Sequence, residues 1–286
     1  PPQDRSERPQ GPWAVIVSKR SKNEMQDRIT LFMHQIDLSH LKSTCGRLCR
    51  WPGVWVLFLL TAASLLSGCA SLSVSPQAVK GAGSDAPLPD GVRAWTEGGV
   101  QSRVTPRIRS VAEACRGESR RERLYWAMGY VWESFAYDPW LKTRAFRRTA
   151  DVLYEDKRLS GCSDFALAEI ALFRAVGIPA RMVITCNVDW IHLYRIDGVS
   201  LPEGHSFIEV YLEDRWHLVD STFRWLFSEY DPEEPFYPHG EIFVRRGRDF
   251  WDMGIRSLGD LERMLKQAAS RYEGGFREPV YPKDPL

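Results

Sequence analysis

Residues 161–183 read GCSDFALAEIALFRAVGIPARMV, and residues 204–222 read GHSFIEVYLEDRWHLVDST. After Gly161 and Cys162 the first stretch is apolar almost all round, which is typical of a helix buried in the centre of a domain. A Gly-Ile-Pro sequence then ends the helix. The second stretch has a strand-like run on each side of Glu213-Asp214, which predicts a β-hairpin. Together they predict a buried helix followed by antiparallel strands.

Helix signals also lie upstream of this pair of stretches. Thr105-Pro106 predicts a helix start, with threonine as the N-cap and a short helix to about Cys115. Ser119 and Glu122 have capping-box spacing and open a second helix, which Asp138-Pro139 ends. We expect a third helix over residues 145–154.

Strand-like segments follow the buried helix, at residues 180–185, 190–196, 205–212 and 215–222. Aromatic-rich loops at 223–243, a short helix near Phe250 and an amphipathic helix over 257–272 are expected in the tail. Helices that precede an antiparallel sheet define the α+β class. We therefore predict an α+β core over residues 105–222, with a C-terminal extension over 223–286 that packs on it.

The predicted hairpin brings a histidine and an aspartate together. If Glu213 and Asp214 form the loop, Phe207 pairs with Asp220, and His205 lies diagonally from Asp220 on the same face. Diagonal neighbours are roughly 7–8 Å apart at the backbone and closer at the side-chain tips. An imidazole and a carboxylate can meet at that separation. His217 alternates to the opposite face, and His192 is an outside candidate.

Cys162 sits at the first turn of the buried helix, where the partial positive charge of the helix N-terminus favours a thiolate. The unpaired backbone N–H groups there, that of Cys162 included, could stabilise an oxyanion. A thiolate, an imidazole and an orienting carboxylate form the cysteine version of the nucleophilic triad, here Cys162, His205 and Asp220. An inert buried cysteine is the alternative. We interpret Cys115 and Cys186 as core or free thiols.

These stretches resemble the catalytic core of the bacterial transglutaminase-like superfamily, whose pattern includes G-x-C-x-D-x-A, R-x-x-G-I-P-A-R, H-A-W-x-E-V and W-x-x-V-D-P-T. The chain matches it over roughly residues 122–222. It departs from the pattern at Ser206-Phe207 and at Ser221. The matching positions are Gly161, Cys162, Asp164, Ala166, Arg174, Gly177 to Arg181, His205, Glu209, Val210, Trp216, Val219, Asp220 and Thr222.

The resemblance implies a papain-like α+β fold. It also implies Cys162 as the nucleophile, His205 as general base and then acid, and Asp220 as the residue that orients the histidine. The family often has an aromatic residue near the oxyanion, upstream of the cysteine. The candidates are Trp126, Trp132 and Tyr137, for each of which a core role is the alternative.

The N-terminal quarter is typical of a targeting region. Basic residues precede the apolar run 51–67, and Leu66-Ser67-Gly68-Cys69 resembles the lipobox of bacterial lipoproteins. We expect a leader or upstream translation over residues 1–32, with Met33 as the favoured start, and a lipoprotein signal peptide over 33–68. Lipidation is expected on Cys69, and an uncleaved membrane anchor is the alternative. Residues 69–104 are rich in Ser, Ala, Gly and Pro, which predicts a flexible tether.

Composition excludes several classes of function. The chain of 286 residues has 38 Lys and Arg against 37 Asp and Glu, so a net charge of +1 gives no basis for a nucleic-acid partner. It is 44% hydrophobic and 26% charged, which excludes a mainly disordered chain. The six cysteines are too few for a disulfide scaffold, and neither C-x-x-C nor H-E-x-x-H occurs. We expect no metal and no cofactor.

We therefore predict a lipid-anchored protein of the bacterial cell envelope, at the outer membrane and facing the periplasm. Its substrate would be a protein or peptide, whose peptide or side-chain amide bonds it hydrolyses or transfers through a thioester. Protease, deamidase and crosslinker share every catalytic residue, and hydrolysis is favoured. The alternatives are a non-catalytic module that binds a peptide or glycan through the aromatic tail, and a metal-dependent hydrolase, which lacks paired ligand spacing.

Overall fold

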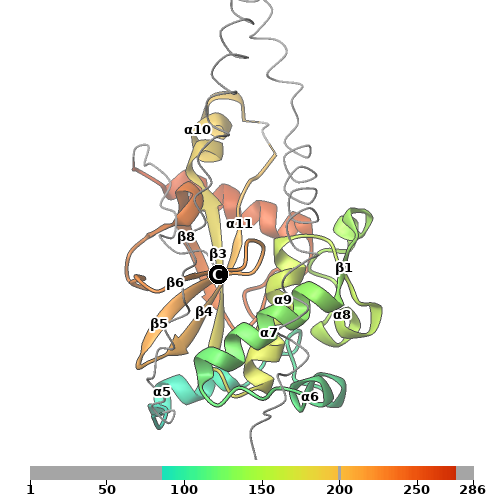
Figure 1. Cartoon of the computed structure of the whole chain (residues 1–286). Coiled ribbons are helices and arrows are strands. Elements are labelled where there is room, and N and C mark those ends of the chain that lie inside the picture. Colours follow the sequence, from blue (N-terminus) through green and yellow to red (C-terminus); the bar gives the residue numbers. More distant parts are fainter. Residues whose placement is uncertain (1–85, 199–200, 275–286) are drawn as a thin grey trace, which may run out of the picture. The chain divides into compact units, whose positions relative to one another are not determined.

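The computed structural model of the chain describes residues 86–198 and 201–274 (Figure 1). The chain divides into two units, Pro1–Ala78 and Val79–Leu286, and the described residues belong to the second. The predicted leader, the signal peptide and Cys69 lie outside the described residues. Within the described ranges, none of the helices is both long and apolar enough to cross a membrane.

The end of the predicted tether is part of the folded unit. Residues 86–104 contain the short helices α5 (Asp90–Arg93) and η3 (Ala94–Thr96). Gln101 and Ser102 are fully buried, and the carboxylate of Asp249 accepts hydrogen bonds from both of their backbone N–H groups at 3.0 Å. The prediction that the tether extends to residue 104 is therefore wrong at this end, because a distant carboxylate fixes a locally polar segment.

The first two predicted helices start where expected. Helix α6 (Pro106–Ala112) has Thr105 as its N-cap, and helix α7 (Arg120–Ser134) has the predicted capping box of Ser119 and Glu122. One side of α7 is buried, through Leu124, Ala127, Met128 and Val131. This side packs against α9 (Cys162–Ala175).

The third helix starts later than predicted. A 3₁₀ helix, η4 (Pro139–Arg144), comes first, and α8 runs only over Ala150–Asp156. Phe146 has a left-handed backbone (φ 65°), which interrupts a right-handed helix, and the Thr149 side chain caps α8 by accepting from Val152 N. The flanking residues form a parallel pair of short strands, β1 (Ala136–Tyr137) and β2 (Arg158–Leu159).

Six strands form one antiparallel sheet in the order β6-β5-β4-β3-β8-β7. The centre is β3 (Ala180–Asn187) beside β4 (Ser206–Leu212), with β5 (Arg215–Asp220) next to β4. Residues beyond 222 supply the other three strands: β6 (Trp225–Phe227), β7 (Phe236–Tyr237) and β8 (Glu241–Gly247). The C-terminal extension therefore adds strands at both edges of the sheet.

Two expectations for the second half are wrong. Residues 190–196 belong to helix α10 (Val188–Asp197), whose N-cap Asn187 accepts a hydrogen bond from Trp190 N at 3.0 Å. The segment around Phe250 forms turns and no helix. The final helix, α11 (Leu258–Arg271), starts after its N-cap Ser257, in agreement with the predicted range of 257–272.

Helix α9 is the centre of the core. It is buried without interruption from Ser163 to Arg174 and packs against β3 and β4, while α6, α7 and α8 pack around it. Figure 1 shows these helices gathered on one side of the strands. On the sheet, a smaller apolar cluster contains Val183, Phe207, Leu218, Phe227 and Tyr237. The predicted α+β class, with a central buried helix on an antiparallel sheet, is confirmed.

Candidate active site

The β4–β5 hairpin has the predicted register. Leu212 pairs with Arg215, and the ladder continues to Ile208 opposite Val219. Both loop residues, Glu213 and Asp214, have left-handed backbones (φ 51° and 61°), as a tight two-residue hairpin loop requires. This register is what brings a residue just before β4 close to the last residue of β5.

Those two residues are His205 and Asp220, and they form a hydrogen bond. The Nε2 atom of His205 lies 3.1 Å from Oδ2 of Asp220, whose side chain is fully buried. The other carboxylate oxygen, Oδ1, accepts from the backbone N–H groups of Thr222 at 2.9 Å and Phe223 at 3.2 Å. The carboxylate is therefore oriented from two sides, with one oxygen directed to the histidine.

Burial alone would raise the pKa of Asp220, but the charge and hydrogen bonds of the neighbouring histidines outweigh it and hold that pKa well below its usual range. Burial likewise lowers the pKa of His205, whereas the Asp220 charge and hydrogen bond raise it well above its usual range. The net effect is an ionised carboxylate beside a histidine that retains its proton.

Cys162 is the first residue of α9, directly after the N-cap Gly161. The side chains of His205 and Ser206 lie close enough to its thiol to shift the thiol's pKa. Burial raises the pKa of the Cys162 thiol, but the hydrogen bond and charge of His205 prevail, so the pKa is lowered. With Nε2 of the imidazole directed to Asp220, Nδ1 is the nitrogen left for the thiol. Both pKa shifts favour a thiolate–imidazolium pair.

The structure thus brings Cys162, His205 and Asp220 together. The packing of α9 on β4 supplies the cysteine, and the hairpin supplies the other two residues. The first backbone N–H groups of a helix have no acceptor within that helix, so the N–H of Cys162 is available to a developing oxyanion. The catalytic roles of these groups follow from chemistry and remain predictions.

The aromatic oxyanion candidates lie in different surroundings. Trp126 stacks on Tyr130 of the same helix, with ring centroids 5.6 Å apart. Trp132 donates from its indole Nε1 to the backbone carbonyl of Ser221 at 2.9 Å, so its N–H supports the end of β5. Tyr137 lies in β1 opposite Leu159 of β2. These positions do not select an oxyanion donor, and the roles of Trp126 and Tyr137 stay predictions.

Two other histidines have positions unlike that of His205. His217 is fully buried on β5, and its Nε2 is 3.2 Å from the carbonyl of Leu212. Burial, together with Arg121 and Arg215, lowers the pKa of His217 to about 4, so it is neutral at pH 7. His192 lies on α10 and contacts the ring of Tyr272 edge-on.

A histidine that sequence reasoning missed also reaches this site. Nε2 of His239 lies 2.9 Å from Oδ2 of Asp220. His239 follows Pro238 within the predicted aromatic-rich loops over 223–243, and no motif or periodicity marks it. Its position depends on β8 pairing with β3, a contact between distant segments, so no local signal could have found it.

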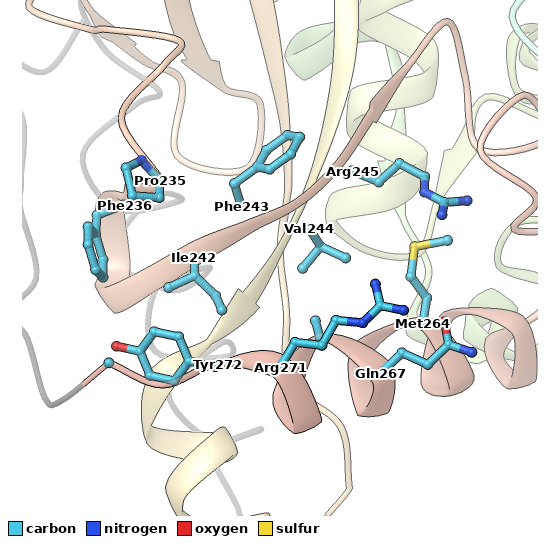
Figure 2. Close-up of a pocket in the computed structure, with 12 residues that line it drawn as sticks. Pro235, Phe236, Ile242, Phe243, Val244, Arg245, Met264, Gln267, Arg271 and Tyr272 are labelled. Carbon is cyan, nitrogen blue, oxygen red and sulfur yellow. The ribbon is translucent and has the colours of Figure 1, made fainter.

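A cavity of about 410 Å³ lies between β8 and α11 (Figure 2). Cys162, His205 and Asp220 do not line it, so it is not where the proposed chemistry takes place. Its lining consists of Pro235, Phe236, Ile242, Phe243, Val244, Arg245, Met264, Gln267, Ala268, Arg271, Tyr272 and Gly274.

In this arrangement a cysteine at a helix N-terminus faces a histidine that an aspartate orients. Enzyme folds that use a cysteine nucleophile have this type of site. Residues 109–221 match the model of the transglutaminase-like superfamily. This part of the chain is therefore a transglutaminase-like domain, and the predicted family is confirmed.

Two solved structures are similar to the chain. One, from Cytophaga hutchinsonii and described as a "Putative Cysteine Protease", has 17% identity and a TM-score of 0.44, covering 60% of this chain and 53% of its own. The other, described as a TGase, has 16% identity and a TM-score of 0.28, covering 65% of this chain and 40% of its own. The chain thus spans about half the length of these proteins or less. None of the curated proteins matches it.

Proposed function

We propose that the protein is a cysteine-nucleophile enzyme that cleaves amide bonds in proteins or peptides through a thioester, with hydrolysis as its main reaction. The observation that carries this proposal is Cys162 beside the hydrogen-bonded pair of His205 and Asp220, where the pKa of the thiol is lowered and that of the imidazole is raised. A thiolate is the reactive form of cysteine, and an imidazolium can supply the proton that a leaving amine needs.

In the proposed reaction the Cys162 thiolate attacks the amide carbonyl carbon, and the His205 imidazolium gives its proton to the departing nitrogen. The C–N bond breaks, and the acyl group remains on sulfur as a thioester. The neutral imidazole then takes a proton from water, whose oxygen forms the new bond to carbon as the C–S bond breaks. A carboxylic acid leaves, and the thiolate–imidazolium pair is restored. An amine in place of water would give a crosslink.

Asp220 stays ionised throughout this cycle, because its pKa lies well below its usual range. It keeps Nε2 of His205 protonated and thereby directs Nδ1 to the thiol. The backbone N–H of Cys162 would bind the oxyanion that forms at each addition step. Each residue therefore has a separate role, which a substitution can test.

Thiol labelling of the full chain tests the proposal. We expect iodoacetamide near neutral pH to alkylate Cys162 faster than Cys115, although both residues are half-buried. It should also alkylate Cys162 faster than Cys186, which is buried and has a pKa that burial raises. Peptide mapping by mass spectrometry separates the sites. The His205→Ala variant should remove the advantage of Cys162. Equal rates at Cys162 and Cys115 in the unsubstituted protein would contradict the enzyme proposal.

Equal rates would instead support a second candidate, a non-catalytic module that binds a peptide or glycan. The observation in its favour is a group of half-buried aromatic rings beside the site. Phe223 stacks on Trp225 with centroids 4.9 Å apart, and both lie within three to five residues of Asp220 in the chain. Such rings can bind apolar groups of a ligand.

We also propose that Cys69 is lipidated and holds the protein at the cell envelope, on the outer membrane facing the periplasm. The support is the basic segment, the apolar run 51–67 and the four-residue sequence that ends at Cys69. A Cys69→Ser variant should leave the membrane fraction.

A comparison of peptides from envelope fractions with and without Cys162→Ala would distinguish water from an amine as the acyl acceptor. Hydrolysis shortens peptides, whereas transfer to an amine joins them.

A further inference from the structure

Two imidazoles converge on one oxygen of Asp220. Nε2 of His205 lies 3.1 Å from Oδ2, and Nε2 of His239 lies 2.9 Å from the same atom. The two rings are nearly perpendicular, with centroids 5.8 Å apart. The buried carboxylate of the proposed triad is therefore shared between two histidines.

The ring of His239 is held firmly in place. His239 lies in the turn η5 (Pro238–Gly240) and has a left-handed backbone (φ 63°). Its ring stacks on Phe207, with centroids 6.1 Å apart and planes 9° apart, and on Trp225, at 5.7 Å and 23°. Only 20% of its side chain is exposed. These contacts direct Nε2 towards Asp220.

Both histidines donate to this oxygen. An ionised carboxylate can only accept hydrogen bonds, and the pKa of Asp220 lies well below its usual range. Nε2 of His239 must therefore carry a proton, as must Nε2 of His205. Each additional donor reduces the negative charge that the shared oxygen presents to the other ring.

We propose that His239 is a positioning residue: its Nε2–H binds Oδ2 of Asp220 and limits the charge that this carboxylate presents to His205. This inference rests on the proposed function, because it concerns the same triad. The other oxygen of Asp220 is held by the backbone N–H groups of Thr222 and Phe223, so the carboxylate keeps its place without His239. The effect of His239 is therefore on charge at His205.

The titratable and charged groups around His239 come from three parts of the fold. Asp220 ends β5, and His205 precedes β4. Glu241 starts β8, two residues after His239, and burial raises its pKa to about 7 while the charge of His205 opposes that shift. Glu241 is present in every protein compared below, so its presence alone does not explain a shift seen only in His239→Phe.

Two substitutions separate the hydrogen bond from the ring. His239→Phe keeps the aromatic stack and removes the N–H donor. His239→Gln loses the ring but keeps an N–H donor of similar reach. A phenylalanine elsewhere in the chain, Phe146, has a φ of 65°, close to the 63° of His239.

The experiment measures the pH dependence of Cys162 alkylation by iodoacetate in the full chain. Iodoacetate is an anion that the His205 imidazolium attracts, so its rate falls when the imidazolium loses its proton. The alkylation rate plotted against pH therefore has a descending limb on its high-pH side. Without the His239 donor, Asp220 stabilises the imidazolium more strongly. We expect this descending limb to move to higher pH by about 0.5–1 unit in His239→Phe, and to stay in place in His239→Gln. An unmoved limb in His239→Phe, or a shift only in His239→Gln, would overturn the proposal.

The outcomes for this inference and for the proposed function are distinguishable. Slow alkylation of Cys162 in the unsubstituted protein would contradict the function, whereas fast alkylation with an unmoved limb in His239→Phe contradicts only the role of His239. If His239→Phe does not fold, imidazole ¹⁵N NMR of the unsubstituted protein decides. A protonated Nε2 on His239 at neutral pH supports the proposal, and an unprotonated Nε2 overturns it.

Discussion

The indole Nε1 of Trp132 donates a hydrogen bond to the backbone carbonyl of Ser221 at 2.9 Å. Trp132 lies on α7, and Ser221 directly follows Asp220. The ring of Trp132 also packs against Phe165, within the first turn after Cys162, with centroids 5.4 Å apart. One side chain therefore connects the start of α9 with the end of β5, which carry the cysteine and the aspartate of the proposed site.

Trp132→Phe should weaken this connection. The substitution keeps an aromatic ring and leaves the buried carbonyl of Ser221 without this donor, which costs about 1–3 kcal/mol. We expect the free energy of unfolding, measured in urea, to fall by that amount, and alkylation of Cys162 to slow. Trp140→Phe, at a tryptophan whose side chain is exposed, is the control and should leave the alkylation rate unchanged. Similar rates in the two variants would show that Trp132 has no special role.

Asp220→Asn should make Cys162 less reactive. The charge of Asp220 raises the pKa of His205 against the effect of burial, so its removal lowers that pKa and disfavours the imidazolium that supports the thiolate. Alkylation at pH 7 should slow roughly tenfold for each unit by which the His205 pKa falls below 7, because the imidazolium population falls by that factor. Asp214→Asn, in the exposed loop of the same hairpin, is the matched control and should have no effect. An equally fast Asp220→Asn variant would argue against the triad.

Arg148→Ala should strongly destabilise the fold. Arg148 and Asp164 are both buried, and they form an ion pair at 2.5 Å beside the first turn of α9. Removing the arginine leaves a buried carboxylate with its charge uncompensated, which costs about 3–5 kcal/mol. Arg107→Ala breaks an exposed pair with Glu155 and should cost at most about 1 kcal/mol. Chemical denaturation of both variants tests this, and equal losses would contradict it.

Glu169→Gln should change how stability depends on pH. Glu169 is fully buried on α9, and burial raises its pKa well above the usual range, although Ser221 and Arg224 oppose the shift. In the unfolded chain a glutamate ionises at a pH of about 4.3. Above that pH the unfolded state releases the proton while the folded state keeps it, so rising pH increasingly favours unfolding. The folded wild-type protein therefore loses stability relative to the unfolded state over this range.

The variant lacks this titration, so its unfolding free energy relative to wild type should increase from pH 4 towards pH 7. The increase is about 1.4 kcal/mol for each unit by which the pH exceeds the unfolded pKa, up to the folded pKa. Any constant cost of the buried amide cancels in this comparison. Urea denaturation at several pH values measures the trend, and a difference that does not vary with pH would refute the prediction.

Much of the fold could be predicted because the signals are local. Thr105 and Ser119 cap helices as their neighbouring residues suggested, through side-chain bonds to backbone groups a few residues away. Residues 190–196 were mistaken for a strand because a short apolar segment fits both periods. The Asn187 cap, which starts α10, lies just before that segment.

The sequence by itself determined two parts of the site. Cys162 starts a helix, because a glycine precedes a mostly apolar run of helical length. His205 and Asp220 share a face, because a two-residue loop sets the hairpin register. Only the tertiary structure decided that α9 packs on β4 and brings the thiol to His205. It also decided that His239 reaches Asp220, since this depends on pairing between β3 and β8, which are far apart in the chain. Such long-range contacts come from burial and packing over the whole core, and no short segment encodes them.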